Sequence, residues 1–143
     1  AAAAPAAEKT VLPLAGLHLL LAEDNELNSE IATALLEEQG AKITAVENGR
    51  LALEAIQNAA PRTYDVILMD VMMPEMNGLE ATRCIRAFEG KGPGEGTPII
   101  AMTANVFADD VKACLDAGMN SHVGKPLDMK VLIGEILKYT DAR

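Results

Sequence analysis

Short apolar runs alternate with amphipathic segments along most of this chain, and this alternation constrains the fold more than any other feature. Five runs have the length of a strand and are rich in Leu, Ile and Val. They cover residues 17–22, 43–46, 66–69, 99–102 and, more weakly, 121–123. The third run, VILM, is apolar at every position, which is typical of a strand that is buried on both faces.

The segments between these runs have the spacing of helices. Apolar residues recur there at intervals of three and four, which predicts a helix in each segment. The positions with this spacing are Leu27, Ile31, Ala34 and Leu35; Ala52, Ala55, Ile56 and Ala59; Ala81, Ile85 and Phe88; Val111, Cys114 and Leu115; and Met129, Leu132, Ile133 and Ile136. Gly40 and Gly118 follow the first and fourth of these helices, where a left-handed glycine commonly ends a helix.

Strands that alternate with helices predict an α/β fold. Five such units predict a (βα)5 architecture, a doubly wound five-stranded parallel sheet with helices on both faces. The 143 residues suffice for one domain. We divide the chain into an Ala-rich linker at 1–16, this domain at 17–140 and a tail at 141–143. Because the chain starts without Met and is Ala-rich at its front, we expect it to be a piece of a longer polypeptide.

Charge and composition exclude several classes of function. Twelve Lys and Arg against 21 Asp and Glu give a net charge of −9, which argues against binding to nucleic acid. The apolar stretch at 11–22 is too short to span a bilayer, so we expect a cytoplasmic domain without direct membrane contact. Two cysteines, Cys84 and Cys114, are too few for a metal quartet, and we expect buried, reduced thiols.

Polar residues follow four of the five predicted strands at their carboxyl ends. Glu23 and Asp24 follow the first strand, Asp70 the third, Thr103 the fourth and Lys125 the fifth. In a parallel sheet these ends share one edge, where ligands bind. Three carboxylates placed together repel one another unless a cation lies among them, and oxygen ligands suit Mg²⁺. A carboxylate can also accept a phosphoryl group and form an aspartyl-phosphate.

Each of these residues has an ordinary structural interpretation when it is taken alone. The acidic pair fits a solvated loop or the start of a helix, and Asp70 fits the cap of a turn. Thr103 fits a helix N-cap and Lys125 a surface lysine. Their joint occurrence at the ends of predicted strands favours a common site.

Four motifs carry a resemblance to a known family. They are LLAEDN at 20–25, DVILMDVMMPEMNG at 65–78, IIAMTAN at 99–105 and GKP at 124–126. With these motifs in this order, residues 17 to about 140 resemble a receiver domain of the two-component response-regulator family. The resemblance implies a flavodoxin-like sheet with strand order 2-1-3-4-5.

The resemblance also implies a role for each residue of the site. Asp70 resembles the phosphoacceptor, which takes a phosphoryl group from a phosphohistidine on a partner. Glu23 and Asp24 resemble the pair that holds Mg²⁺ together with Asp70 and the backbone carbonyl of Met72, with Mn²⁺ as a substitute. Lys125 resembles the lysine that pairs with the phosphoryl oxygens.

The remaining positions concern switching and the lifetime of the phosphate. Thr103 resembles the switch hydroxyl, Pro126 resembles a cis-proline, and the bistable part would include the helix at 106–118. His122 departs from the family, which usually has Tyr or Phe there, so a switch role and a partly exposed edge-strand histidine both stay open. Met72 and Asn105 occupy the two variable positions that flank the phosphorylation site and are expected to tune the phosphate lifetime.

The sequences of the motifs are most similar to those of C-terminal receivers of hybrid sensor histidine kinases. This implies a phosphoacceptor with self-dephosphorylation, rather than a turnover enzyme. The implied partners are a histidine kinase phosphodonor domain and a histidine phosphotransfer domain, with a weak homodimer as a further expectation. A stand-alone response regulator acting by protein contact is the alternative. A haloacid dehalogenase-like phosphohydrolase is more distant, because Met72 stands where its second Asp would transfer protons.

Overall fold

The computed structural model describes residues 12–60, 62–73, 76–92, 95–104 and 108–140. Strands and helices alternate through these ranges, as the sequence predicts. They are β1 (His18–Ala22), α2 (Glu26–Glu38), β2 (Lys42–Val46), α3 (Gly49–Gln57), β3 (Val66–Asp70), α4 (Gly78–Glu89), β4 (Ile99–Thr103), α5 (Ala108–Ala117), β5 (Ser121–Gly124) and α6 (Met129–Thr140). Residues 1–11 and 141–143, most of the expected linker and the whole tail, lie outside the described ranges, so this division of the chain stays a prediction.

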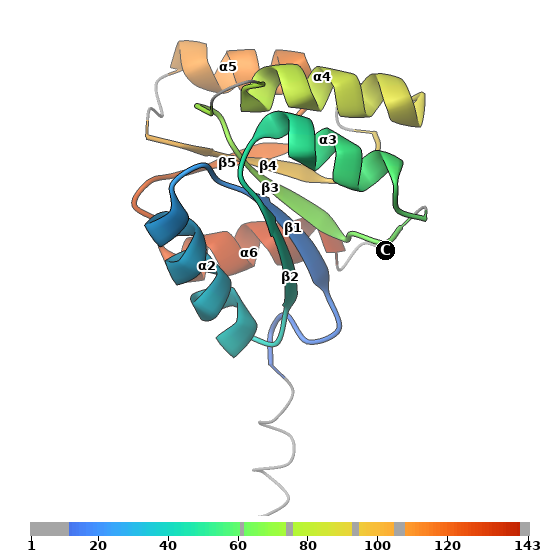
Figure 1. Cartoon of the computed structure of the whole chain (residues 1–143). Coiled ribbons are helices and arrows are strands. Elements are labelled where there is room, and N and C mark those ends of the chain that lie inside the picture. The colour runs from blue at the N-terminus through green and yellow to red at the C-terminus, as the bar shows by residue number, and fades with distance from the viewer. Residues whose placement is uncertain (1–11, 61, 74–75, 93–94, 105–107, 141–143) are drawn as a thin grey trace, which may run out of the picture.

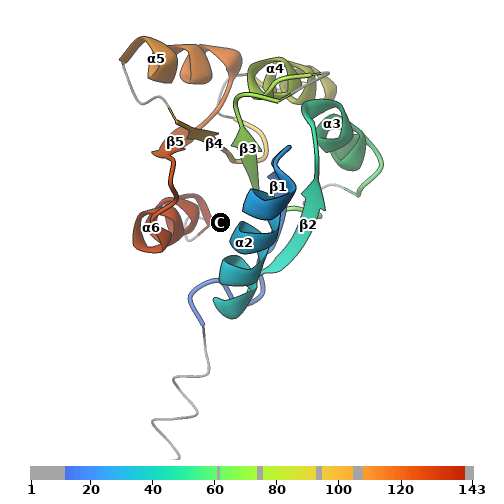
Figure 2. The same ribbon diagram turned by 60° about the vertical axis from the view of Figure 1, so that its left-hand side comes forward.

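The five strands form one parallel sheet in the order β2-β1-β3-β4-β5. Helices α3, α4 and α5 cover one face and α2 and α6 cover the other (Figure 1). The turned view shows the same two layers, with α2 and α6 together on one side of the sheet (Figure 2). The predicted doubly wound sheet and its strand order are therefore confirmed.

The strand register brings the carboxyl ends of the strands to one edge of the sheet. Ala22 pairs with Met69, and the following residue of β3, Asp70, pairs with Met102 of β4. Thr103 is then level with Gly124 at the end of β5. The residues that follow β1 and β5 therefore leave the sheet at the same edge as Asp70 and Thr103.

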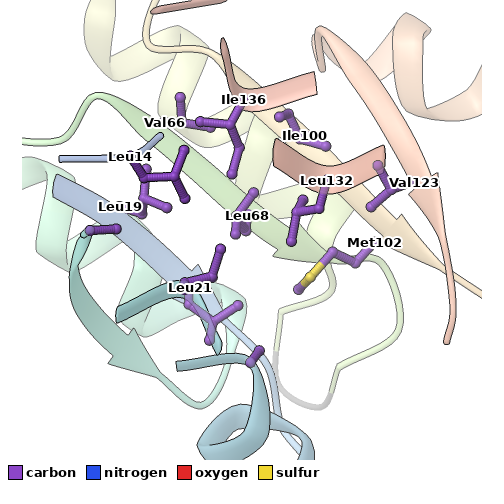
Figure 3. Close-up of a cluster of buried hydrophobic side chains, with 13 residues drawn as sticks. Leu14, Leu19, Leu21, Val66, Leu68, Ile100, Met102, Val123, Leu132 and Ile136 are labelled. Carbon is purple, nitrogen blue, oxygen red and sulfur yellow. The ribbon is translucent and has the colours of Figure 1, made fainter. Parts of the chain in front are cut away.

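Two apolar clusters, one on each face of the sheet, form the core. The cluster beneath α2 and α6 includes Leu21, Leu68 and Leu132, all fully buried (Figure 3). The cluster beneath α3, α4 and α5 includes Ile67 and Ile85. Of the two cysteines, Cys114 is buried and Cys84 partly buried, and both are free thiols.

Leu14 belongs to the first cluster although it precedes β1. Its side chain is fully buried, and its N–H donates a hydrogen bond to the carbonyl of Gln39 at 2.9 Å. Figure 3 shows it beside Leu19 and Val66. The segment before β1 is thus packed against the domain from at least this residue onward.

Helix α2 forms where the apolar spacing predicts it, but the residues that define the spacing do not face the core. Leu27 is 64% exposed, Ile31 50% and Leu35 38%. The buried residues of this helix are Ala32 and Leu36. The helix therefore has two apolar faces, and the one with the larger side chains is in solvent.

Local signals at the helix ends agree with the sequence. Asn25, Asn48 and Asn77 are the N-caps of α2, α3 and α4, and each side-chain oxygen accepts a hydrogen bond from a backbone N–H in the first turn. Gly40 and Gly118 have φ angles of 100° and 117°. Both lie just past the end of a helix, in the left-handed conformation that the sequence predicts there.

Candidate functional site

The carboxyl edge of the sheet carries a cluster of charged side chains. Glu23 and Asp24 follow β1, and Asp70 is the last residue of β3. These two strands are neighbours at the centre of the sheet, because the chain passes from β1 to β2 on one side and returns to β3 on the other. Such a reversal of strand order is where doubly wound sheets bind ligands.

The three carboxylates lie close enough to share one cation. One oxygen from each of Glu23, Asp24 and Asp70 lies within 4.8 Å of the others. Glu23 is 5% and Asp70 4% exposed, whereas Asp24 is exposed. The cluster is therefore buried on its inner side and open to solvent at Asp24.

Lys125 reaches into this cluster from the loop after β5. Its Nζ lies 3.0 Å from Glu23 Oε2 and 3.0 Å from Asp70 Oδ2. The peptide bond between Lys125 and Pro126 is cis, as the family resemblance implies. The lysine thus bridges two buried carboxylates that come from different strands.

Burial and neighbouring charges perturb the protonation of this cluster. Burial raises the pKa of Asp70 to about 6, with the Lys125 hydrogen bond opposing the rise and the Glu23 carboxylate adding to it. Burial also acts to lower the pKa of Lys125, but its hydrogen bonds with Glu23 and Asp70 outweigh this and raise it. At neutral pH the charged form of Asp70 is therefore held in an environment that disfavours it.

The donor set fits a hard divalent cation. Its ligands are carboxylate oxygens without sulfur or imidazole, which Mg²⁺ prefers. A cation would also relieve the repulsion from Glu23, which adds to the effect of burial on the pKa of Asp70. The backbone N–H of Met72 donates to Asp70 Oδ1 at 3.2 Å, which holds the carboxylate and the following loop together.

Two other predicted residues, Thr103 and His122, lie in the strands β4 and β5. Thr103 is 7% exposed, and its backbone carbonyl accepts a hydrogen bond from the Lys125 N–H at 2.9 Å. His122 is partly buried in β5. Its neighbours Ser121 and Val123 face α6, so side-chain alternation puts His122 on the face of the sheet that α5 covers. Asn105 lies outside the described residues.

An acidic groove beside the cluster was not predicted from the sequence. A cavity of about 350 Å³ is lined by Glu23 and Asp24 together with Glu26, Glu30 and Glu47. Glu47 directly follows β2, so the same rule of strand ends that led to Asp70 would have led to it. A larger cavity, of about 660 Å³, lies at the opposite edge of the sheet and contains none of the predicted site residues.

The chain is similar to receiver domains both in sequence and in structure. The family model described as the response regulator receiver domain matches residues 19–137. A probable histidine kinase of Oryza sativa subsp. indica is 41% identical over 140 residues, which cover 78% of this chain and 14% of the kinase. The chain thus spans about one seventh of the length of that relative.

Two solved structures share the fold closely. One is the receiver domain of a sensor histidine kinase from Pseudomonas aeruginosa, with a magnesium ion coordinated in its active site cleft. It is 37% identical with a TM-score of 0.77, over 89% of this chain and 99% of that one. The other is the receiver domain of a Saccharomyces cerevisiae response regulator in a co-crystal with a histidine phosphotransfer protein. It is 25% identical with a TM-score of 0.79, over 90% of this chain and 91% of that one. Among the described residues, no helix has the length and apolar character needed to cross a membrane.

Proposed function

This chain belongs to the response regulator receiver family, and from that premise we propose that Asp70 accepts a phosphoryl group from a phosphohistidine on a partner protein. The observation that supports this most directly is the Lys125 ammonium, 3.0 Å from the Asp70 carboxylate in a cluster of acidic ligands. Phosphoryl transfer depends on positioning and on neutralisation of charge, and this arrangement supplies both.

The proposed roles follow the positions of the side chains. An Asp70 oxygen attacks the phosphorus while the bond to the donor imidazole breaks, and the electron pair of that bond stays on the imidazole nitrogen. Lys125 is already beside the Asp70 oxygen and pairs with the incoming phosphoryl oxygens. The Met72 N–H holds the other Asp70 oxygen, which orients the carboxylate for attack.

Glu23, Asp24 and Asp70 would hold Mg²⁺, with the backbone carbonyl of Met72 as a further ligand. When bound, the ion supplies positive charge that stabilises the phosphoryl oxygens in the transition state. Mn²⁺ prefers similar oxygen ligands, and we expect it to substitute for Mg²⁺.

The added phosphate would act as a switch. It carries about −1.5 to −2 charge and strong acceptor oxygens. Thr103 is at the end of the strand next to Asp70, so its hydroxyl is placed to move toward those oxygens. Rearrangement of β4, β5 and α5 would then change the affinity of this face for partners. His122 is on the same side of β5 as α5, and its part in this rearrangement stays a proposal, as does lifetime tuning by Met72 and Asn105.

The context we favour is a hybrid sensor histidine kinase in the cytoplasm or on the cytoplasmic face of a membrane. The chain would take the phosphoryl group from the kinase core and pass it to a histidine phosphotransfer domain. Support comes from the 41% identity to a probable histidine kinase and from the receiver bound to a phosphotransfer protein. A stand-alone response regulator remains the alternative, and domains beside this one in the parent gene distinguish the two.

The assignment of Asp70 is tested with acetyl phosphate as a small phosphodonor in the presence of Mg²⁺. The wild type should gain one phosphoryl group, stable in acid and released by hydroxylamine, and EDTA should prevent this. Asp70→Asn should gain none. Asp65→Asn, just before the start of β3, is the matched control and should behave as the wild type. Phosphate of this kind on the Asp70→Asn protein would refute the assignment.

A further inference from the structure

Arg86 is buried at the edge of the sheet opposite to the candidate site. The residue is 4% exposed, although it carries a full charge. Its Nε donates to the carbonyl of Gly118 at 3.0 Å, and its Nη2 donates to Asn120 Oδ1 at 2.9 Å. Its Nη1 donates to the carbonyl of Thr97 and to Glu89 Oε1, both at 2.9 Å. A buried guanidinium with this many partners holds them in fixed positions, because losing one leaves a buried donor unsatisfied.

Asn120 connects Arg86 to the first residues of two strands. Its Oδ1 also accepts a hydrogen bond from the N–H of Ile99, the first residue of β4, at 2.9 Å. Its own N–H donates to the carbonyl of Ile99 at 2.8 Å. The next residue, Ser121, is the first of β5. Through Arg86 and Asn120, helix α4 therefore fixes β4 and β5 relative to each other.

The far end of β5 carries Lys125. Among the strands that the structure describes, β5 is at the edge of the sheet and pairs with β4, from Ile100–Ser121 to Thr103–Gly124. It has four residues, about 13 Å of extended chain. Lys125 follows directly, and its N–H donates to the carbonyl of Thr103. A shift of β5 at Asn120 is therefore carried along the strand to the lysine.

From this connection we infer that Arg86 is a positioning residue for phosphoryl transfer to Asp70, acting through Asn120 and β5 on the place of the Lys125 ammonium. The inference rests on the proposed function of Asp70 and Lys125. It assigns a functional role to a buried ion at the opposite edge of the sheet, where a purely structural role would affect stability alone. A misplacement of about 1 Å at a reacting group can cost as much as a hundredfold in rate.

The test compares Arg86→Met with Arg83→Met, an exposed arginine one turn earlier on α4. The initial rate of phosphorylation by acetyl phosphate is measured at saturating Mg²⁺, at a temperature where circular dichroism shows every variant to be folded. We expect Arg86→Met to be about tenfold slower, with Mg²⁺ affinity not reduced, and Arg83→Met to equal the wild type. In a Lys125→Ala background, Arg86→Met should cause no further decrease, because the two residues act through one group.

Variants of Asn120 test the same inference if Arg86→Met does not fold. Asn120→Ala removes the shared acceptor and should also slow phosphorylation, whereas Asn120→Asp keeps an oxygen there and should restore the rate. The inference would be overturned if folded Arg86→Met and Asn120→Ala were phosphorylated at the wild-type rate. It would also be overturned if Arg86→Met slowed phosphorylation as much in the Lys125→Ala background as it does in the wild type. Failure of the proposed function is a separate result, because then the wild type itself would not be phosphorylated on Asp70.

Discussion

Asp70 is held in a position that is unfavourable for its own charge. Every residue of β3 is buried, and Asp70 at its end is only 4% exposed. Lys125 offsets part of the cost, but Glu23 adds a second carboxylate beside the same ammonium. Two buried carboxylates therefore share one lysine, and the protein keeps a local instability at the residue proposed to react.

Replacement of Asp70 by Asn should therefore stabilise the protein in the absence of divalent cations. The folded pKa of about 6 lies above the ordinary value of 3.8. Protonated Asp70 is favoured in the folded state, so it adds to the free energy of unfolding. This contribution is fully present below about pH 3.8 and is lost as the pH rises through 6. At pH 7.5 we expect Asp70→Asn to raise the free energy of unfolding by about 1–3 kcal/mol. Thermal unfolding in EDTA between pH 4.5 and 7.5 measures this, and the gain should shrink toward the acid end.

Asp116→Asn is the control for the loss of one negative charge. Its side chain is 64% exposed in α5, where it pairs with Lys112. We expect its unfolding temperature to follow that of the wild type at each pH. If Asp70→Asn were less stable than the wild type at pH 7.5, the attraction of Lys125 would outweigh the burial of the charge.

The charged residues of the site could be predicted because a parallel sheet gathers the ends of its strands. The sequence predicts Glu23, Asp24, Asp70 and Lys125 at this edge, and the structure brings them together. The bridge from Lys125 to Glu23 could not be predicted, because it joins residues 102 positions apart through the conformation of a flexible side chain. The raised pKa of Asp70 also depends on burial, which the sequence does not state.

Helix α2 shows that the spacing of apolar residues does not determine which face of a helix is buried. Spacing of three and four predicts a helix, but α2 has apolar residues on two sides. Ala32 and Leu36 pack on the sheet, while Leu27 and Ile31 point to solvent. The period of a sequence predicts the helix, and the space available beneath it decides which face is buried.

The exposed face of α2 should serve the protein phosphodonor rather than the chemistry. Leu27 is in the first turn of α2, close to Asp24, so this face begins beside the candidate site. Ile31 is 50% exposed, so burying the rest of its side chain under a partner is worth about 1 kcal/mol, and a buried Glu charge there would cost more. We expect Ile31→Glu to slow transfer from a phosphorylated partner at least about tenfold and to leave phosphorylation by acetyl phosphate unchanged. Phosphotransfer followed with radiolabelled donor protein measures both rates.

Phe88→Glu is the matched control for that change. Phe88 is 52% exposed, close to the 50% of Ile31, but it lines the cavity at the opposite edge of the sheet. Transfer from the partner should be unaffected by it. Equal slowing by both variants would show that the effect comes from added negative charge and not from contact at α2.

Two glycines should respond in opposite directions to replacement by alanine. Gly40 has a φ of 100°, and a Cβ there would lie 2.9 Å from the backbone of Ala15. Gly40→Ala should therefore destabilise the protein by about 2 kcal/mol. Gly134 is inside α6, with nothing within 4 Å of an added Cβ, so Gly134→Ala should stabilise by about 0.5–1 kcal/mol. Urea unfolding of the two variants measures both, and destabilisation by Gly134→Ala would contradict the open space around it.

The molecule as a whole consists of a stable sheet with its reactive groups at one edge. Apolar clusters cover both faces of the sheet, and Leu14 extends one of them to the segment before β1. The carboxyl edge carries the unfavourable charges, and the Arg86 network ties α4 to β4 and β5 at the other edge. Folding free energy is thus supplied by the core, while the acidic edge is available for binding a cation.

A divalent cation at that edge should therefore stabilise the entire domain. A ligand that binds only the folded state adds RT ln(1 + [L]/Kd), or about 1.4 kcal/mol at ten times Kd, which is a rise of about 5 °C in Tm for a chain of this size. We expect Mg²⁺, and Mn²⁺ likewise, to produce this rise in the wild type. Asp24→Asn should need much more Mg²⁺ for the same rise, because a proposed ligand is lost. Glu47→Gln removes an equal charge from the adjoining groove and should leave the rise nearly intact. If Glu47→Gln weakened the response as much as Asp24→Asn, the ions would be held by diffuse negative charge, and no coordinated site would be needed to explain the stabilisation.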